Sequence, residues 1–260
     1  MKIKFFAYFA TLALALSLNA QKVTLQECVE LGEKHIFAGG ECIEFAVSNG
    51  DREGYLNIIV HGTWPDGTNT LGRYAPFAET LTMSTDITTV AVALPGYSSS
   101  STNNFTALAH EGTKNLAAKE EYVRFLASLV KALKDKFEAE TVTYIGHSAG
   151  AMMGATLTGF EPDLINNIVL AGGRYDIHKE VKDGGLVSVV DVLDKVSKDT
   201  KFVLIYGTAD KISEPKVTKD FYELALKNGF DVKLVEVPNA PHLDLDMNDK
   251  SVEAIIELLE

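Results

Sequence analysis

The chain has 260 residues, of which 46% are hydrophobic and 23% charged, a composition typical of a globular protein with an ample core. This length favours one large α/β domain over two. The formal net charge of −12, from 24 basic and 36 acidic residues, disfavours nucleic acid and anionic membrane surfaces as partners.

Residues 1–20 differ from the rest of the chain. Lys2 and Lys4 form a short basic region, residues 5–18 are almost uninterruptedly apolar, and the first polar stretch begins after Ala20. This order predicts a secretory signal peptide that is cleaved after Ala20. An uncleaved membrane anchor is the alternative, but the apolar run is short for a membrane-spanning helix. We therefore expect a secreted or periplasmic protein with no stable membrane span after cleavage.

Residues 21–260 are expected to form a single domain that begins with a β hairpin over residues 21–53. Apolar and polar residues alternate twice in this segment, and Gly-Gly and Asn-Gly pairs supply turn signals. Export would allow a disulfide between the two cysteines, and two free thiols are the alternative. Asn104 begins a glycosylation sequon by pattern. The alternating residues are Cys28, Val29 and Leu31 in the first run and Cys42, Ile43, Phe45 and Val47 in the second.

Beyond the hairpin, apolar runs typical of buried strands alternate with stretches of helical periodicity. Strands that alternate with helices predict a doubly wound α/β fold, with a mostly parallel sheet covered on both faces. Residues 174–199 are polar and mixed, and are expected to form a small cap or a surface helix. The predicted strands are residues 55–60, 87–94, 141–145, 167–171, 201–206 and 232–237, and the predicted helices are residues 113–137, 151–157, 216–227 and 251–258.

The stretch TVTYIGHSAG, residues 141–150, carries the strongest chemical signal. A β-branched and aromatic strand runs into Gly146-His147-Ser148-Ala149-Gly150, and a helix pattern follows. Strand, Gly-x-Ser-x-Gly and helix together are the context of a nucleophile elbow. Side chains at Gly146 and Gly150 would collide with the neighbouring strand or helix. The strained turn would lift the Ser148 hydroxyl above the carboxyl edge of the sheet.

A serine needs a base to become a nucleophile, and the base needs a carboxylate to orient it. His242 follows the last predicted strand, and Asp210 follows the strand at residues 201–206. Both therefore lie at carboxyl ends of strands, where ligands bind in such sheets. Their order in the chain, serine then acid then base, is consistent with Ser148, Asp210 and His242 acting together.

Other residues compete for these roles. His178, in the expected cap, is the rival base, and Asp176 is the alternative acid. Asp244 and Asp246 lie too close to His242 in sequence to be the first choice. The remaining histidines are expected to be surface or packing residues, or, for the residue beside Ser148, unable to reach back to it; they are His35, His61, His110 and His147.

Acyl transfer also requires hydrogen-bond donors for the oxyanion. The backbone N–H of Ala149, the residue after the serine, is one candidate. The second is expected from the loop after the strand at residues 55–60, from the N–H of Thr63 or of Trp64. The side chain of His61 in this loop is expected to be structural and to bond loop backbone.

These motifs resemble the serine hydrolases of the α/β-hydrolase fold. The resemblance rests on His61-Gly62, the Gly-x-Ser-x-Gly elbow, Gly207-Thr208-Ala209-Asp210 and Ala240-Pro241-His242, and it covers residues 55–260. It implies Ser148 as nucleophile, His242 as base and Asp210 as acid. The pair Trp64-Pro65 is similar to one in epoxide hydrolases, but those carry an aspartate nucleophile, so Ser148 favours acyl chemistry.

The sequence therefore predicts a serine hydrolase, with a carboxylesterase of small-molecule acyl esters as the favoured activity and no metal or organic cofactor. A peptidase similar to prolyl oligopeptidases is the nearest alternative, but no segment supplies an obvious site for a peptide terminus. A lipase would need an apolar lid, and residues 174–199 are too charged for one. An acyltransferase or perhydrolase remains open, and a non-catalytic binding protein is disfavoured because all three triad candidates are present.

Overall fold

The computed structural model describes residues 23–64, 68–97, 115–182 and 184–260. The predicted signal peptide at residues 1–20 and the sequon at Asn104 lie outside these ranges. Among the described residues, no helix combines the length and the apolar character needed to cross a membrane.

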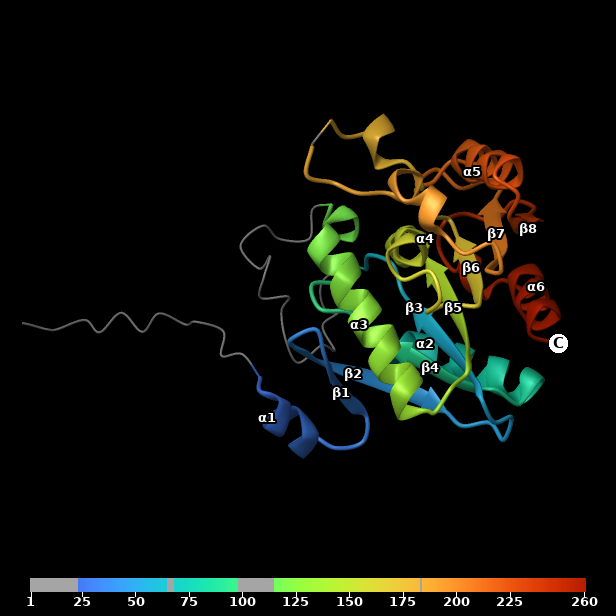
Figure 1. Cartoon of the computed structure of the whole chain (residues 1–260). Coiled ribbons are helices and arrows are strands. Elements are labelled where there is room, and N and C mark those ends of the chain that lie inside the picture. Colours follow the sequence, from blue (N-terminus) through green and yellow to red (C-terminus); the bar gives the residue numbers. More distant parts are fainter. Residues whose placement is uncertain (1–22, 65–67, 98–114, 183) are drawn as a thin grey trace, which may run out of the picture.

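An eight-stranded sheet forms the centre of the protein, in the order β1-β2-β4-β3-β5-β6-β7-β8 (Figure 1). Strands β3 to β8 are parallel to one another, whereas β2 is antiparallel to both β1 and β4. The predicted mostly parallel sheet with an N-terminal hairpin is therefore confirmed. The strands are β1 His35–Ala38, β2 Glu41–Ser48, β3 Tyr55–Val60, β4 Thr88–Val92, β5 Thr141–His147, β6 Asn167–Ala171, β7 Lys201–Gly207 and β8 Asp231–Val237.

Helices cover both faces of the sheet, which makes the fold doubly wound (Figure 1). Neighbouring strand residues point into different cores: Ile58 belongs to the core that also contains residues of α3, α4 and α5, and Ile59 to the core that contains residues of α2 and α6. The burial of both side chains explains why the central strands are continuous apolar runs. The helices are α2 Thr70–Thr85, α3 Glu120–Lys136, α4 Ala149–Phe160, α5 Pro215–Lys227 and α6 Asp249–Leu259.

Helix α2 is a feature that the sequence patterns do not indicate. It carries several threonines and a proline, Pro76, within the helix, and these residue types disfavour helical structure. The helix forms because Tyr74, Phe77 and Leu81 are buried against the sheet. Its start is stabilised by Asn69, whose side chain accepts a hydrogen bond of 2.8 Å from the Gly72 N–H.

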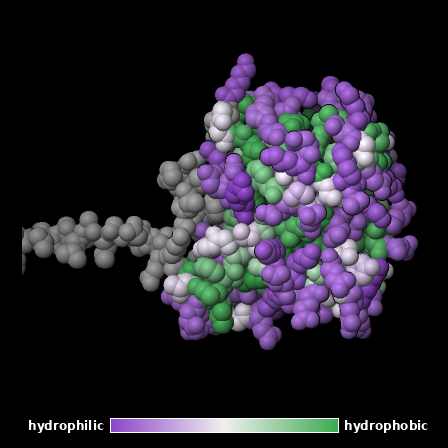
Figure 2. Space-filling view, viewed as in Figure 1, coloured by the Kyte–Doolittle hydropathy of each residue, from purple (hydrophilic) through white to green (hydrophobic). Residues whose placement is uncertain are grey.

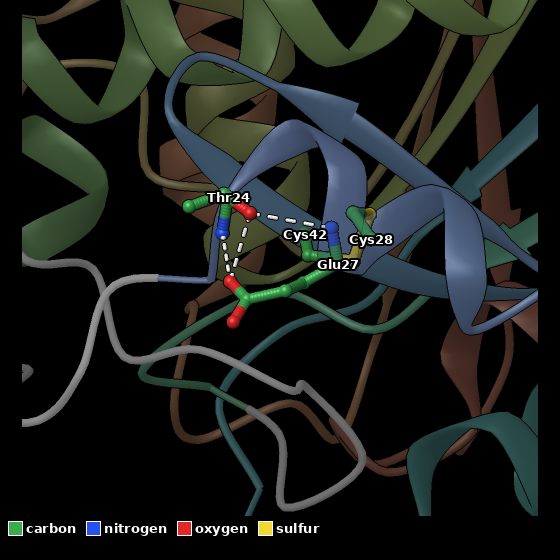
Figure 3. Close-up of a disulfide and its surroundings, with 4 residues drawn as sticks. All are labelled: Thr24, Glu27, Cys28 and Cys42. Atoms are coloured by element: carbon green, nitrogen blue, oxygen red, sulfur yellow. Dashed lines mark hydrogen bonds between the residues drawn. A yellow bond between two sulfur atoms is a disulfide. The ribbon is translucent and has the colours of Figure 1, made fainter.

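The hairpin lies within residues 21–53, but its first strand is not the predicted one. The run around Cys28 forms a short helix, α1 Leu25–Glu30, and the first strand is β1. A capping box explains this: the Thr24 hydroxyl accepts a bond of 3.2 Å from the Glu27 N–H, and the Glu27 carboxylate accepts one of 2.7 Å from the Thr24 N–H (Figure 3). Leu25, Val29 and Leu31 are exposed, which gives the hydrophobic surface seen over α1 in Figure 2.

Residues 174–199 form three single-turn 3₁₀ helices rather than one surface helix. The first is η3 Ile177–Lys179, and the other two, η4 Val189–Asp191 and η5 Leu193–Lys195, lie against α4. Gly159 of α4 leaves room for Val192, because a Cβ at this glycine would lie 2.5 Å from a Val192 methyl carbon. The second half of this segment, with η4 and η5, therefore packs directly on α4.

The predicted disulfide between Cys28 and Cys42 is present, and it joins α1 to β2 (Figure 3). Both cysteines are fully buried. The bond closes a loop with a sequence separation of 14 residues. A chain-entropy model gives a loop of this size a stabilisation of about 3 kcal/mol.

We therefore expect the double variant Cys28→Ser with Cys42→Ser to lose about 3 kcal/mol in the free energy of unfolding, because its unfolded chain gains conformational entropy. Urea unfolding with and without a reductant measures this loss. Reductant should lower the unfolding midpoint of the natural protein and leave that of the double variant unchanged. Equal midpoints for oxidised and reduced natural protein would contradict the prediction.

Candidate active site

The turn between β5 and α4 places Ser148 in a backbone conformation that a non-glycine residue rarely adopts. Its φ is 55° and its ψ is −115°, between the last strand residue, His147, and the first helical residue, Ala149. The turn is held at both ends by backbone hydrogen bonds: the Ser148 N–H donates to the Ala171 carbonyl at 2.8 Å, and the Met152 N–H donates to the Ser148 carbonyl at 3.0 Å. Such strain is found at functional sites more than elsewhere.

Three glycines allow the chain to pass so close to this turn. A Cβ at Gly146 would lie 2.8 Å from the backbone of Gly150 and Ala151, and a Cβ at Gly150 would lie 2.1 Å from the Val60 carbonyl oxygen of β3. A Cβ at Gly62, in the loop after β3, would lie 2.6 Å from the Ser148 Cβ. Side chains at Gly146 and Gly150 would therefore collide with the helix and the strand, as the motif predicts.

The site lies where the strand order of the sheet reverses. Strand β3 lies between β4 and β5, so the chain leaves β3 towards one edge and continues from β5 towards the other. Crevices for ligands form at the carboxyl ends of strands at such a point. The loop after β3 and the turn after β5 both lie there.

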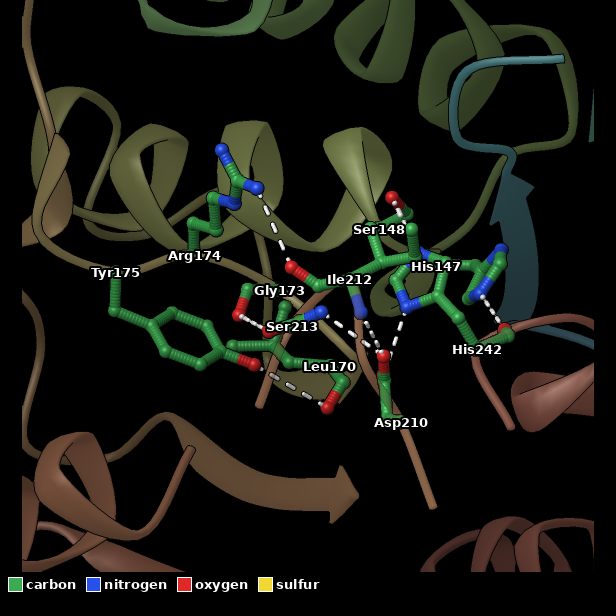
Figure 4. A network of polar contacts seen from close by, with 10 residues as sticks. All are labelled: His147, Ser148, Leu170, Gly173, Arg174, Tyr175, Asp210, Ile212, Ser213 and His242. Carbon is green, nitrogen blue, oxygen red and sulfur yellow. Dashed lines mark hydrogen bonds and ion pairs between the residues drawn. The ribbon is translucent and has the colours of Figure 1, made fainter. Parts of the chain in front are cut away.

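Side chains from three separate strand ends meet at Ser148 (Figure 4). His242 Nε2 lies 2.9 Å from Ser148 Oγ, and His242 Nδ1 lies 2.7 Å from Asp210 Oδ2. The structure thus brings together the serine, histidine and aspartate that the sequence singles out. The Asp210 side chain is fully buried and that of His242 is 16% exposed, so the histidine is the member of the pair that solvent reaches.

Asp210 is held as an acceptor by the loop that follows it. The Ile212 and Ser213 N–H groups donate to its Oδ1 at 2.8 and 2.9 Å, while its Oδ2 accepts from His242 (Figure 4). Burial by itself raises the pKa of this carboxyl group, but the hydrogen bonds from His242 and from the two backbone N–H groups outweigh burial and hold the pKa below its usual value. Asp210 is therefore a carboxylate at neutral pH.

The backbone around His242 is fixed by the residue next to the serine. His147 Nε2–H donates to the His242 carbonyl at 2.9 Å, and the centres of the two rings are 4.9 Å apart. Gly172, with a φ of 60°, packs against the imidazole, since a Cβ there would lie 3.1 Å from His242 Cε1. His147 does not reach Ser148, as expected, but it positions the loop that carries His242.

The rival candidates lie elsewhere. His178 pairs with Asp191 at 2.8 Å, and Asp176 lies 3.8 Å from the Lys179 amine. Asp244 forms an ion pair with Arg73 of α2, and Asp246 is buried beside Tyr74 of the same helix. His35 lies in β1, and His110 lies outside the described residues.

His61 has the structural role expected of it. The Leu94 N–H donates to His61 Nε2 at 3.1 Å, so the proton of the neutral ring is on Nδ1, which donates to the Gly62 carbonyl at 2.7 Å. Burial lowers the pKa of His61 to about 4, even though the bond to the Gly62 carbonyl acts in the opposite direction. The imidazole therefore stays neutral and ties the loop after β3 to the chain after β4.

The two oxyanion candidates of this loop differ in their surroundings. Thr63 lines the cavity that contains Ser148 and Ala149. The Trp64 indole lies under the Arg73 guanidinium, 4.3 Å from the ring centre, and meets the Tyr74 ring edge-on at 6.4 Å. Since Arg73 also pairs with Asp244, one side chain of α2 contacts both the loop that carries Thr63 and the loop that carries His242.

The cavity above Ser148 has a volume of about 380 Å³ and a largely apolar wall. Arg174 lies at its edge and is paired with Glu180 at 2.5 Å. Neither the wall nor Arg174 is marked by a sequence motif, because these residues come from five separate segments. The apolar wall consists of Tyr97, Ala117, Ala118, Met152, Ile177 and Ile212.

Comparison with known proteins shows the family to which this fold belongs. Residues 58–196 match the family described as alpha/beta hydrolase fold. Because the match spans more than half of the chain, the protein belongs to the α/β-hydrolase-fold family. No curated protein sequence matches the chain.

Solved structures share the fold at low sequence identity. A protein of unknown function from Agrobacterium tumefaciens, described as an α/β hydrolase, has a TM-score of 0.64 and 14% identity and covers 88% of this chain and 94% of its own. An α/β serine hydrolase without a lid from Xanthomonas campestris has a TM-score of 0.57 and 14% identity, over 84% and 86% of the two chains. Est1E from Butyrivibrio proteoclasticus, with ferulic acid bound, has a TM-score of 0.58 and 14% identity, over 87% and 96%.

The tight contact at Gly150 leads to a test of the elbow. We expect Gly150→Ala to lower the free energy of unfolding by on the order of 2–3 kcal/mol, because the new methyl group would meet the backbone of β3 and neither side can move freely. Chemical denaturation measures the loss. Gly184→Ala is the control, since a Cβ at Gly184 has no neighbour within 4 Å. Equal stability of the two variants would contradict the clash.

His61 leads to a prediction about pH. The folded protein holds the pKa of His61 at about 4, below its ordinary value of 6.5, so on acidification the unfolded chain takes up this proton first. We expect His61 to contribute a loss on the order of 3 kcal/mol in the free energy of unfolding as the pH falls from about 6.5 to about 4.

Urea unfolding at several pH values, on the natural protein and on His61→Gln, measures this contribution. The variant lacks the titrating group, so its stability should fall less over the same interval, although it starts lower at pH 7. Parallel pH profiles for the two proteins would show that His61 contributes nothing to the pH dependence.

Proposed function

We propose that the protein is a serine hydrolase that cleaves carboxylic esters, with Ser148, His242 and Asp210 as its catalytic residues. The observation that carries the proposal is the unbroken chain of hydrogen-bond contacts from Ser148 Oγ through the imidazole to Asp210. It is supported by the strained conformation of Ser148 and by membership of the α/β-hydrolase-fold family. The relative from Xanthomonas campestris, described as a serine hydrolase, points the same way.

In the proposed mechanism, Ser148 Oγ attacks the acyl carbonyl carbon while its proton passes to His242 Nε2. Asp210 stabilises the resulting imidazolium through the bond from Nδ1–H. The oxyanion is bound by the N–H of Ala149 and by the N–H of Thr63 or Trp64. His242 then gives the proton to the alcohol oxygen as its bond to the acyl carbon breaks. A water molecule attacks the acyl carbon while His242 takes its proton, and this proton returns to Ser148 Oγ as the bond to the serine breaks and the acid leaves.

The cavity favours neutral substrates. Among the described residues that line it, the cation is Arg174, and Glu180 already balances its charge. A peptidase would need a charged group for a substrate terminus, so the ester is the better supported substrate. The apolar wall and the modest volume suit a small acyl group.

We further propose that the protein is exported, with residues 1–20 removed as a signal peptide and residues 21–260 as one domain. The disulfide between Cys28 and Cys42 supports this, because such bonds persist in oxidising compartments.

The test of the activity is hydrolysis of p-nitrophenyl esters from acetate to palmitate, compared with aminoacyl p-nitroanilides. We expect ester turnover by the natural protein and a fall in kcat on the order of 10⁴-fold or more in Ser148→Ala, because the nucleophile is lost. Ser128→Ala is the matched control: this serine is exposed on α3 and bonds the Arg124 carbonyl.

Three outcomes would overturn the proposal. Turnover that survives in Ser148→Ala would remove Ser148 from the mechanism. Anilide turnover above ester turnover would make the protein a peptidase. A fluorophosphonate probe that fails to label Ser148 would mean that the serine is not activated at all.

A further inference from the structure

A second cavity, of about 270 Å³, lies beside the one that contains Ser148, between residues 174–180 and Val190 on one side and helix α5 on the other. Most of the surface of its wall is apolar, and charged residues surround this wall. Several of the apolar side chains are only partly buried, although nothing in the described residues fills the space. Burying such surface against a ligand is favourable. The apolar lining consists of Tyr175, Val190, Val217, Phe221 and Leu224.

Arg174 forms the boundary between the two cavities and lines both of them. Its guanidinium group donates to Glu180, which lines the second cavity, at 2.5 Å. It also donates to the carbonyl of Ile212, which lines the first cavity, at 3.3 Å (Figure 4). Both Arg174 and Glu180 are 41% exposed, so water competes for this ion pair and the arginine can move aside at little cost. The two cavities are therefore adjacent, and the Arg174 side chain between them can change its position.

The charges at the rim decide the chemistry of a ligand. Each cation there is already paired: Arg174 with Glu180, Lys216 with Asp220 at 2.5 Å, and Lys179 with Asp220 at 3.7 Å. Acidic residues outnumber the cations at this rim, because Asp176 and Glu214 line it as well. Among the described residues that line this cavity, an anionic ligand would find no unpaired cation, whereas a neutral apolar group would meet the aliphatic side chains and the Phe221 ring.

We propose that the second cavity is a substrate subsite that receives a neutral, apolar group of about the size of an aromatic ring. The group belongs to the ester whose carbonyl Ser148 attacks, and a short spacer carries it past Arg174. This inference rests on the proposed esterase function. The cavity at Ser148 alone lies within the size range of known small-molecule sites, roughly 300–1,000 Å³, and the two cavities together still lie within it.

The experiment compares three esters: methyl acetate, 3-phenylpropyl acetate with the ring on the alcohol side, and methyl 4-phenylbutanoate with the ring on the acyl side. The variant is Val217→Trp, which places an indole in the second cavity. The matched control is Leu226→Trp, on the same helix at a position that is 47% exposed and does not line the cavity. Thermal unfolding of both variants serves to check that they are folded.

We expect Val217→Trp to reduce the preference for one phenyl ester, measured as its kcat/KM divided by that of methyl acetate, by about tenfold. The reason is that the indole takes the space in which the phenyl ring would contact the apolar lining. The ester affected tells which side of the substrate occupies the cavity. Leu226→Trp should leave the ratio unchanged. A ratio that stays constant for both phenyl esters in Val217→Trp, or that falls equally in Leu226→Trp, overturns the proposal.

Binding of 3-phenylpropan-1-ol, measured by calorimetry, separates failure of this inference from failure of the proposed function. Binding to the natural protein that weakens about tenfold in Val217→Trp but not in Leu226→Trp supports an apolar subsite, even if no ester is turned over. Binding that is absent, or that is unchanged in Val217→Trp, overturns the subsite, even if methyl acetate is hydrolysed.

Discussion

The backbone conformation of Ser148 is the constraint on which the site depends. A positive φ at a serine costs on the order of 1–3 kcal/mol and persists only where its surroundings enforce it. Here Gly62, Gly146 and Gly150 let two strand ends and a helix start close on the turn, and backbone bonds to Ala171 and from Met152 hold it there. The direction of the serine hydroxyl is therefore set by the packing of the sheet rather than by a side-chain rotamer alone.

The position of His242 is fixed less by its own strand than by contacts from other segments. Asp210 holds one ring nitrogen, His147 holds the main-chain carbonyl, and Gly172 leaves space for the ring. Helix α2 adds a contact from outside through Arg73, which reaches the loop of Trp64 and that of Asp244. A helix that the sequence patterns do not indicate therefore supports the two loops on either side of the serine.

What the sequence predicts well is what depends on local pattern. Strand β3 and strand β6 lie at the predicted residues because both are continuous apolar runs between turn signals. The pattern around Cys28 predicts a strand, because a few alternating residues fit a strand as well as one face of a short helix, and the capping box at Thr24 favours the helix. Helix α2 has a weak intrinsic helix propensity and forms through burial of Tyr74 and its neighbours. The boundary that Arg174 forms between the two cavities exists only once distant segments pack together.

The two edge strands of the sheet have different protection against pairing with another copy of the chain. At one edge, β1 is only four residues long. Helix α1, which the disulfide links to β2, packs against this strand. At the other edge, β8 carries the exposed charged residues Asp231, Lys233 and Glu236. Short, covered or charged edges discourage self-association of sheets. The protection of one edge therefore depends on the oxidation state of its surroundings, and that of the other on ionic strength.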